Sequence, residues 1–305
     1  MKHTVKSSGS SSDGEFMRYF EDKVRSTIDD FKLIDRKDRV LVAVSGGKDS
    51  TSTLYLLHKF GYDVEGLIID QLLGEHSKNN LKNITNFCRD NGIKLHVVHM
   101  RDVYGCSVCY MKSVLDGKGI VMNSCTICGV VRRNILNKKA REIGATVLAT
   151  GHNMDDEAQT MLMNFIKGDM GALARMGPKS GVRPDARFIQ RVKPLFLCAE
   201  AEVKKYSKLM GFPVVYEPCP CSLESYRTEI KKYLNGMEER HPGSKESMLR
   251  GLLEVLPRLK RQYKGTVLRT CSVCGEPSSN KVCRACAIIG LLRSNGSTDS
   301  CQVSR

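Results

Sequence analysis

Two glycines mark a sharp change of hydrophobic pattern early in the chain. Residues 40–44, Val-Leu-Val-Ala-Val, are a run of β-branched and aliphatic side chains typical of a strand buried on both faces. Ser45-Gly46-Gly47 ends that run, and apolar side chains then recur at helical spacing, with Asp49 or Ser50 as the expected N-cap. The sequence therefore predicts a strand, a glycine turn and a helix in direct succession.

This turn has the chemistry of a phosphate-binding loop. Glycines let the backbone approach an anion, the free N–H groups at a helix start donate to phosphate oxygens, and Lys48 adds a positive charge. The ATPase motif G-x-x-x-x-G-K-S/T does not fit, because Val42 stands at its first glycine and Asp49 at its hydroxyl position. Ser-Gly-Gly-Lys-Asp-Ser instead resembles the pyrophosphate loop of ATP pyrophosphatases. The alternative is a glycine-rich turn that binds nothing.

The charge balance of the 305-residue chain favours a polyanionic partner. The chain carries 48 Lys and Arg against 33 Asp and Glu, a net charge of +15. Nucleic acid is the usual partner of such an excess, and a surplus of solubilising charge is the alternative. No apolar run approaches the roughly 18 residues of a membrane span, and the N-terminus lacks the apolar core of a signal peptide. We therefore expect a cytoplasmic protein with no membrane partner.

Strands and helices are predicted to alternate along the chain. Apolar runs predict further strands at 63–70, 94–100 and 145–150, and periodic apolar side chains predict helices at 16–34, 77–91, 130–143, 199–210, 226–240 and 245–263. Such alternation gives an α/β fold with a doubly wound parallel sheet, in which ligands bind at the carboxyl ends of the strands. Those ends are expected at Ser45, Asp70, Arg101 and Gly151.

Acidic side chains follow Gly151 at the same predicted edge. Residues 151–157, Gly-His-Asn-Met-Asp-Asp-Glu, open a helix whose inward face is expected to contain Ala158, Leu162, Phe165 and Ile166. Asp155 and Asp156 beside a phosphate loop are suited to hold Mg2+ on a triphosphate. The alternative is that Asn153 or Asp155 only caps the helix.

A basic, glycine- and proline-rich segment follows at residues 168–195. Its charged side chains suit contact with a nucleic-acid backbone, and a solvated loop is the alternative. They are Arg175, Lys179, Arg183, Arg187, Arg191 and Lys193.

Four cysteines near the C-terminus have the spacing of a metal site. Cysteines are seldom paired as disulfides in a reducing compartment, so the 13 in this chain are more readily understood as metal, cluster or redox ligands. A C-x2-C-x8-C-x2-C arrangement can close a tetrahedral zinc site with no open position. Its ligands would be Cys271, Cys274, Cys283 and Cys286. We expect a small structural zinc finger that depends on its metal to fold.

The central cysteines allow two interpretations. The spacing Cys106-x2-Cys109-x15-Cys125-x2-Cys128 is typical of a zinc ribbon. Alternatively, Cys125, Cys128 and one cysteine of the Pro-Cys-Pro-Cys segment, Cys219 or Cys221, would hold an iron–sulfur cluster with one iron free to bind sulfur. The second interpretation is favoured by the position of Cys125 and Cys128 directly before a predicted helix at the ligand edge of the sheet.

Five motifs together resemble tRNA 2-thiouridine synthetases of the TtuA and NcsA type. In chain order they are Ser45–Ser50, Cys125-Thr-Ile-Cys128-Gly-Val-Val-Arg-Arg, Gly151-His-Asn-Met-Asp-Asp-Glu, the Cys-Pro-x-Ser at Cys219, and the C-terminal four-cysteine finger. The resemblance covers roughly residues 16–292. It implies a PP-loop ATP pyrophosphatase, Rossmann-like, that adenylates the C2 oxygen of a tRNA uridine and replaces it with sulfur, using a 4Fe-4S cluster.

The resemblance also implies roles for individual residues. ATP phosphates would bind the loop, the adenine would lie near Ala43 and Ile69, and Gly151 would border the nucleotide. Asp155 or Asp156 would position Mg2+, and Arg132 or Arg133 would stabilise the adenylated oxygen. The cluster ligands would be Cys125, Cys128 and Cys219. Cys221 replaces a usual aromatic residue, Cys106 and Cys109 lie outside the family pattern, and the family's N-terminal zinc finger has no counterpart here.

The implied partners are tRNA, a sulfur donor that is either sulfide or a ubiquitin-like thiocarboxylate protein, and a second copy of the chain in a homodimer. The wobble uridine is the favoured target. Alternatives are a T-loop uridine, tRNA 2-thiocytidine synthesis, and a non-catalytic zinc-dependent RNA-binding subunit. The expected domains are a disordered tail or cloning remnant at 1–15, the PP-loop domain with its Fe-S site at 16–265, the zinc finger at 266–292 and a disordered tail at 293–305.

Overall fold

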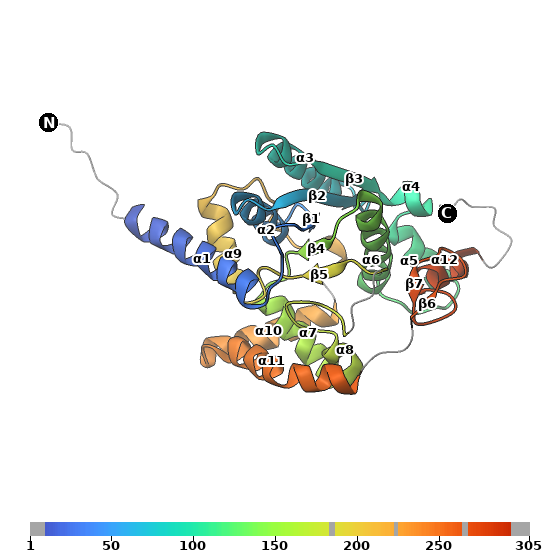
Figure 1. The fold of residues 1–305 in the computed structure, drawn as a ribbon. Helices are drawn as coiled ribbons and strands as arrows, with labels where there is room; N and C mark the ends of the chain where they lie inside the picture. Colours follow the sequence, from blue (N-terminus) through green and yellow to red (C-terminus); the bar gives the residue numbers. More distant parts are fainter. Residues whose placement is uncertain (1–9, 183–186, 223–224, 264–267, 294–305) are drawn as a thin grey trace.

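A parallel sheet of five strands forms the centre of the molecule (Figure 1). The computed structural model describes residues 10–182, 187–222, 225–263 and 268–293. The strand order is β3-β2-β1-β4-β5, and every pair is parallel. The strands are β1 Arg39–Val44, β2 Asp63–Asp70, β3 Leu95–His99, β4 Val147–Thr150 and β5 Gln190–Val192. The predicted parallel α/β fold is confirmed, and the direction of strand addition reverses between β1 and β4.

Alternate residues of β1 enter different halves of the core. Val40, Val42 and Val44 pack on one side of the sheet, whereas Leu41 and Ala43 pack on the other. The first side is covered by α1 Ser10–Asp30, α2 Lys48–Lys59, α3 Glu75–Asp90 and α9 Glu200–Leu209. The second is covered by α4 Met100–Tyr104, α5 Val108–Gly117, α6 Ser124–Ile143 and α12 Arg284–Arg293. Because a strand's side chains alternate between faces, an apolar run of this length requires helices on both sides.

A separate group of helices packs beside the strand end at β4 and β5. It consists of α7 Met154–Ile166, α8 Met170–Ala174, α10 Tyr226–Arg240 and α11 Ser244–Gln262, with two small cores of their own. Phe165 and Ile166, expected to face inward, are 64% and 57% exposed. The expectation was wrong for these two residues, because α10 and α11 cover α7 through Ala158, Leu162 and their neighbours and leave its last turn uncovered.

Several element boundaries differ from the predicted ones. The first helix begins at Ser10 rather than Phe16, and Asp13 in its first turn pairs with Lys205 of α9. Helix α6 begins at Ser124 rather than Val130, since the Asn123 side chain accepts a hydrogen bond from Thr126 N at 2.7 Å. Of the tails expected at 1–15 and 293–305, residues 10–15 belong to α1 and Arg293 belongs to α12, so that expectation was wrong there. Residues 1–9 and 294–305 lie outside the described residues.

The C-terminal module is docked on α6. It contains the short antiparallel strands β6 Arg269–Thr270 and β7 Pro277–Ser278, followed by α12. Glu276 forms an ion pair with Arg141 and accepts a hydrogen bond from Asn137 at 2.8 Å, and the cysteines and apolar face of α12 join the core beneath α5 and α6. No helix of the described residues is long and apolar enough to cross a membrane.

A buried carboxylate ties three strands together at the sheet end away from the glycine loop. Glu65 of β2 accepts hydrogen bonds from Arg39 of β1 at 2.8 Å and pairs with His96 of β3 at 2.5 Å. Burial by itself would raise the pKa of Glu65, but hydrogen bonds from His96 and Arg39 and the charge of Arg39 lower this pKa to about 2. The ionised form of Glu65 is therefore favoured more strongly in the folded chain than in the unfolded one.

We predict that Glu65→Gln destabilises the fold at neutral pH by about 1–3 kcal/mol. Because the folded-state pKa lies below the ordinary 4.5, the stabilisation is complete above that pH and is lost as pH falls toward 2. Urea unfolding at a series of pH values should show the gap between variant and wild type closing over this range. Glu75→Gln, which removes an exposed carboxylate paired with Lys78, is the matched control. A pH-independent gap would contradict the prediction.

Candidate active site

The glycine turn lies at the switch point between β1 and β4. Gly46 has a φ of +78°, and Gly47 is the N-cap of α2, so Lys48 is the first helical residue. No side chain caps the helix, contrary to the expectation for Asp49 or Ser50. The Ser50 hydroxyl instead accepts a hydrogen bond from Ser45 N at 3.0 Å and closes the turn on itself. The first amides of α2 are thus left without side-chain caps, as an anion-binding loop requires.

Two neighbouring segments approach this loop at the limit of contact. A Cβ on Gly46 would stand 2.7 Å from Asn80 Cβ of α3, and one on Gly151 would stand 2.6 Å from Ser50 N. The Asn80 side-chain oxygen is buried and has no hydrogen-bond partner. The conformation of the loop therefore depends on glycine at both positions, and a polar atom is held beside it for a ligand.

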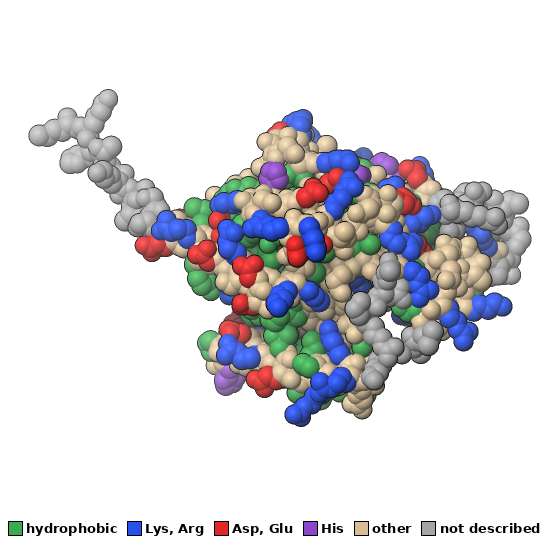
Figure 2. Space-filling model, viewed as in Figure 1, with side chains coloured by type: hydrophobic (Ala, Val, Ile, Leu, Met, Phe, Trp, Pro, Cys, Tyr) green, Lys and Arg blue, Asp and Glu red, His purple; other side chains and the backbone are tan. Residues whose placement is uncertain are grey.

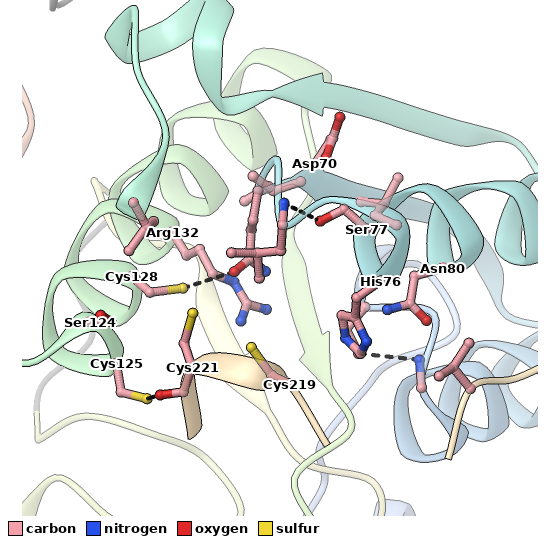
Figure 3. A pocket seen from close by; sticks show the side chains of 18 of the residues that line it. Asp70, His76, Ser77, Asn80, Ser124, Cys125, Cys128, Arg132, Cys219 and Cys221 are labelled. Atoms are coloured by element: carbon pink, nitrogen blue, oxygen red, sulfur yellow. Dashed lines mark hydrogen bonds between the residues drawn. The ribbon is translucent and has the colours of Figure 1, made fainter. Parts of the chain in front are cut away.

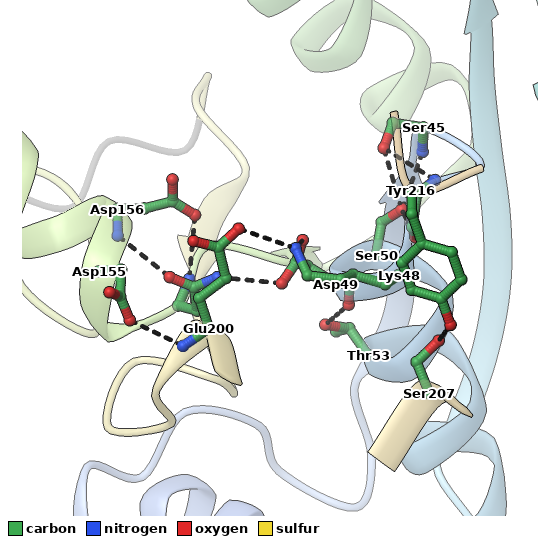
Figure 4. Close-up of polar contacts among 12 residues, drawn as sticks. Ser45, Lys48, Asp49, Ser50, Thr53, Asp155, Asp156, Glu200, Ser207 and Tyr216 are labelled. Carbon is green, nitrogen blue, oxygen red and sulfur yellow. Dashed lines mark hydrogen bonds and ion pairs between the residues drawn. The ribbon is translucent and has the colours of Figure 1, made fainter. Parts of the chain in front are cut away.

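Lys48 is held between two carboxylates. Its Nζ lies 2.9 Å from Asp49 Oδ2 and 3.1 Å from Glu200 Oε1 (Figure 4). Glu200 also pairs with Lys231 at 2.6 Å. Burial by itself would lower the pKa of Lys48, but the charges of Asp49 and Glu200 raise it above the ordinary value. Glu200 was not among the predicted site residues, because it follows the loop by some 150 positions and only α9 brings it there.

The two adjacent aspartates have different environments. Asp155 is buried, 2.5 Å from Lys245 Nζ, and accepts a hydrogen bond from Glu200 N at 2.7 Å. Asp156 is 34% exposed at its side chain and takes part in the capping box of α7 with Asn153. The amide of Asn153 in turn donates to Asp49 Oδ1 at 2.9 Å. Burial, followed by the charge of Asp49, raises the pKa of Asp156 to about 6. Asp156 is thus the aspartate that faces the loop carboxylate.

A cavity of about 390 Å³ joins the loop to the central cysteines (Figure 3). It is bounded by Ser45 and Gly47 at the loop, by Ile69 to Gln71 at the end of β2, and by His76 and Asn80 of α3. Its other wall contains Cys125, Cys128 and Arg132 of α6 together with Cys219 and Cys221. The remaining predicted nucleotide residues are not among those that line this cavity. They lie in β1, in the loop, in the first turn of α2 and directly after β4, and they are Ala43, Gly46, Lys48, Asp49, Ser50 and Gly151.

Helix α6 and the segment around Pro220 present their thiols toward one another. Cys125 Sγ lies 3.4 Å from the backbone oxygen of Cys221, and Cys128 Sγ lies 3.0 Å from Gln71 Oε1. Burial, followed by the charge of Cys219, raises the pKa of Cys125. Burial also raises the pKa of Cys128, although Arg132 opposes the shift. Cys219 borders the same cavity as these two thiols of α6.

The two consecutive arginines of α6 have different surroundings. Arg132 borders the cavity beside Cys128. The guanidinium of Arg133 lies along its own helix near Gly129, and burial, followed by the charges of Arg191 and Arg284, lowers its pKa. Arg132 is the one placed to act on a ligand in the cavity.

The four C-terminal cysteines gather as ligands of a single ion. Their Sγ atoms lie within 4.8 Å of one another, and Cys274 Sγ is 3.7 Å from Cys283 Sγ. Zinc–sulfur bonds of about 2.3 Å in a tetrahedron require sulfur atoms about 3.8 Å apart. Backbone amides of Val273 and Cys283 donate to Cys271 Sγ, which favours the thiolate. This is the one such group among the residues that the structure describes.

The zinc-ribbon interpretation of the central cysteines is therefore wrong for the described residues. Cys106 is buried in the core with α5 and α6, Cys109 is exposed, and neither joins Cys125 and Cys128 in a tight set. The thiols of Cys125, Cys128 and Cys219 share one cavity but are not gathered like those of the finger. A cluster holds its thiolates on separate irons, so wider spacing suits a cluster better than a single ion.

The basic segment is only partly available for contact. Lys193 is buried and pairs with Glu157 at 2.7 Å, so it was wrongly expected at a nucleic-acid surface. Arg183 lies outside the described residues. Figure 2 shows Lys and Arg side chains spread over the visible face, including the region of α11 and the C-terminal module.

Comparisons with known proteins agree in both sequence and structure. The PP-loop domain family matches residues 17–219. A tRNA-5-methyluridine(54) 2-sulfurtransferase of Pyrococcus horikoshii is 35% identical, over 90% of this chain and 86% of its own length. The tRNA 2-thiolation protein NcsA of Haloferax volcanii is 33% identical, over 94% of both chains. The structure of the U34-tRNA thiolase NcsA from Methanococcus maripaludis with its 4Fe-4S cluster superposes with a TM-score of 0.74 at 30% identity, covering 94% of this chain and 90% of that one.

We predict that Gly46→Ala destabilises the chain, whereas Gly47→Ala is tolerated. The first adds a Cβ into Asn80 at a positive φ, while the second meets only Ser45 Oγ at 3.5 Å with an extended backbone. We expect a loss of about 2 kcal/mol or more for Gly46→Ala and a change below about 1 kcal/mol for Gly47→Ala. Urea unfolding of both variants measures the difference, and equal stabilities would refute the steric argument.

Proposed function

The chain belongs to the PP-loop family of tRNA 2-thiolation enzymes of the TtuA and NcsA type, and we propose that it adenylates the C2 oxygen of a tRNA uridine with ATP so that sulfur can replace it. The observation that carries this proposal is the single cavity bounded by the phosphate loop at one end and the thiols of Cys125, Cys128 and Cys219 at the other. The activated C2 oxygen and the incoming sulfur must meet at the same uridine, and a cavity that reaches both the phosphate loop and the thiols allows them to do so.

ATP is proposed to lie across the switch point of the sheet. Its phosphates would be bound by the backbone N–H groups of residues 45–50, including the uncapped start of α2, and by Lys48 once Lys48 exchanges Glu200 for a phosphate. Ala43 and Ile69, at the ends of β1 and β2, would border the adenine. Gly151 would border the nucleotide, and because it carries no side chain its backbone lies directly against Ser50 of the loop.

Asp156 is proposed to hold Mg2+ with Asp49. The Asn153 bridge places Asp49 beside the start of α7. Burial, followed by the charge of Asp49, raises the pKa of Asp156 although Arg227 lies 3.7 Å from its carboxylate, and a bound Mg2+ would compensate both carboxylates. Asp155 would act indirectly, because its carboxylate is already taken by Lys245 and by the backbone of Glu200. Of the two candidate arginines, Arg132 would stabilise the developing charge on the uridine oxygen.

A 4Fe-4S cluster is proposed at Cys125, Cys128 and Cys219. The donor set fits, since three thiols from two segments border one cavity. Cys221 borders the same cavity, and the family pattern assigns the third ligand to Cys219. Three protein ligands leave one iron able to bind sulfur. The related NcsA of Methanococcus maripaludis has a 4Fe-4S cluster, which supports this assignment.

The C-terminal cysteines are proposed to hold structural zinc. Their sulfur spacing fits a closed tetrahedral site, and the module is attached to α6 through Glu276. Zinc there would hold in place the module that packs against the cluster-bearing helix.

The wobble uridine is the proposed target, and the T-loop uridine is the second candidate. The superposed thiolase is named for U34, whereas the relative from Pyrococcus horikoshii is named for methyluridine 54. Sulfide or a ubiquitin-like thiocarboxylate protein would supply the sulfur. The net charge of +15 supports tRNA as the partner.

We predict that Cys125→Ser abolishes both the cluster and tRNA thiolation. Iron and labile sulfide should fall to background in anaerobically purified protein, while zinc, bound at the separate finger, should be unchanged. Cys88→Ala, which changes a buried cysteine outside the site, is the matched control and should keep its iron, labile sulfide and zinc as well as normal thiolation. Nucleoside mass spectrometry of fragments from a complemented deletion strain would assign the sulfur to position 34, position 54 or a cytidine. A variant with a full cluster and normal thiolation would refute the assignment.

We predict that Asp156→Asn and Asp155→Asn fail in different ways. Asp156→Asn should lower tRNA-dependent pyrophosphate release from ATP by about 100-fold or more at unchanged stability, because it removes a ligand of Mg2+. Asp155→Asn leaves the buried Lys245 unpaired and should destabilise the fold by about 3 kcal/mol.

Pyrophosphate release and urea unfolding of both variants separate the two roles. If wild type released no pyrophosphate with any tRNA, the chain would instead be a non-catalytic RNA-binding subunit. Equal stability losses in the two variants would show that the aspartates do not have the distinct roles proposed here.

A further inference from the structure

A glutamine amide contacts one of the proposed cluster thiols across the cavity. Gln71 directly follows the last residue of β2, and it borders the cavity together with Cys128 of α6. The Cys128 thiol donates a hydrogen bond to Gln71 Oε1 at 3.0 Å, between residues 57 positions apart in the chain (Figure 3). Gln71 thus belongs neither to the phosphate loop nor to the proposed ligand set, yet its side chain lies against a proposed ligand.

The backbone around Gln71 is held in a strained turn. Leu72 has a φ of +59°, a conformation that a residue with a β-carbon rarely adopts. Hydrogen bonds on both sides maintain it, because Leu72 N donates to Asp70 Oδ1 at 2.9 Å and Leu73 N donates to Ser77 Oγ at 2.9 Å. Such strain is concentrated at functional sites, where the surrounding structure enforces it. Here the turn fixes the residue that contacts Cys128.

The amide of Gln71 suits a cysteine that is bound to iron. An iron-bound cysteine has no proton on its sulfur and can only accept a hydrogen bond. A glutamine amide has an oxygen on one side and an NH2 group on the other, and a half-turn about χ3 exchanges them. Gln71 Nε2 can therefore donate to the Cys128 thiolate from the position where Oε1 accepts from the thiol.

We propose that Gln71 is a positioning residue for the cluster and donates a hydrogen bond from Nε2 to the ligating sulfur of Cys128. This inference rests on the proposed function, since it requires the 4Fe-4S cluster at Cys125, Cys128 and Cys219. A hydrogen bond to a ligating sulfur withdraws electron density from it and raises the reduction potential of the cluster. It also holds the ligand in place, so that iron is lost more slowly.

The test compares wild type with Gln71→Met and Gln71→Glu in the anaerobically purified full-length chain. Methionine is about as long as glutamine but has no N–H group, and glutamate keeps the shape of glutamine but adds a negative charge and only accepts when ionised. Gln262→Met makes the same chemical change at an exposed position at the end of α11, outside the cavity, and is the matched control. The midpoint potential of the cluster, the rate of iron loss to a chelator, and the zinc content are measured.

Both Gln71 variants should bind a cluster with a more negative midpoint potential, and the shift should be larger for Gln71→Glu. Iron loss to the chelator should be about 10-fold faster in both, as for other partners of metal ligands. Zinc should stay at the wild-type level, and Gln262→Met should match wild type in every measurement.

An unchanged midpoint potential in both variants would overturn the proposal, because a residue that only supports the fold changes stability and leaves the potential where it was. Loss of zinc together with iron would also overturn it, since the defect would then extend to the whole fold. Wild type without iron would overturn the cluster assignment and this inference with it. A normal cluster in wild type with no response in the variants would overturn this inference alone.

Discussion

Gly151 lies against the phosphate loop, where an added Cβ would stand 2.6 Å from Ser50 N and 2.7 Å from the carbonyl carbon of Asp49. This contact exists because β4 pairs directly with β1, so that the segments leaving both strands emerge side by side. The rest of the site depends on it. With the two segments in contact, Asn153 reaches Asp49, and the start of α7 brings Asp156 to the loop. A side chain at position 151 would separate the groups proposed to bind phosphate and Mg2+.

The charged groups around the loop compensate one another within the chain. Lys48 lies between Asp49 and Glu200, and Glu200 is shared with Lys231. These pairs compensate the charge of a largely buried lysine, which avoids the cost of an unpaired buried charge. Binding of a triphosphate and Mg2+ would replace protein partners with ligand partners. Replacing a carboxylate partner of Lys48 by a phosphate costs less free energy than burying a new, unpaired charge.

The chain uses its cysteines in two physically distinct ways. At the C-terminus, Cys274 and Cys283 lie at the spacing of ligands on one tetrahedral ion, in a module fixed to α6 by Glu276. At the cavity, Cys125 and Cys128 face Cys219 across a space that also reaches the phosphate loop. The first arrangement is closed and supports the fold, whereas the second leaves room for a larger group and for substrate.

The sequence by itself determined the parallel α/β fold, the phosphate loop and the four-cysteine finger, because each depends on residues close together in the chain. Alternating apolar runs define strands buried on both faces, and C-x2-C pairs define a local metal site. Only the tertiary structure decided that Glu200 would hold Lys48, that Asp155 would be taken by Lys245, and that the thiol of Cys125 would meet the backbone oxygen of Cys221. These partners are separated by about ninety to more than a hundred positions, and the packing of α6, α9 and α11, not local pattern, sets their distances.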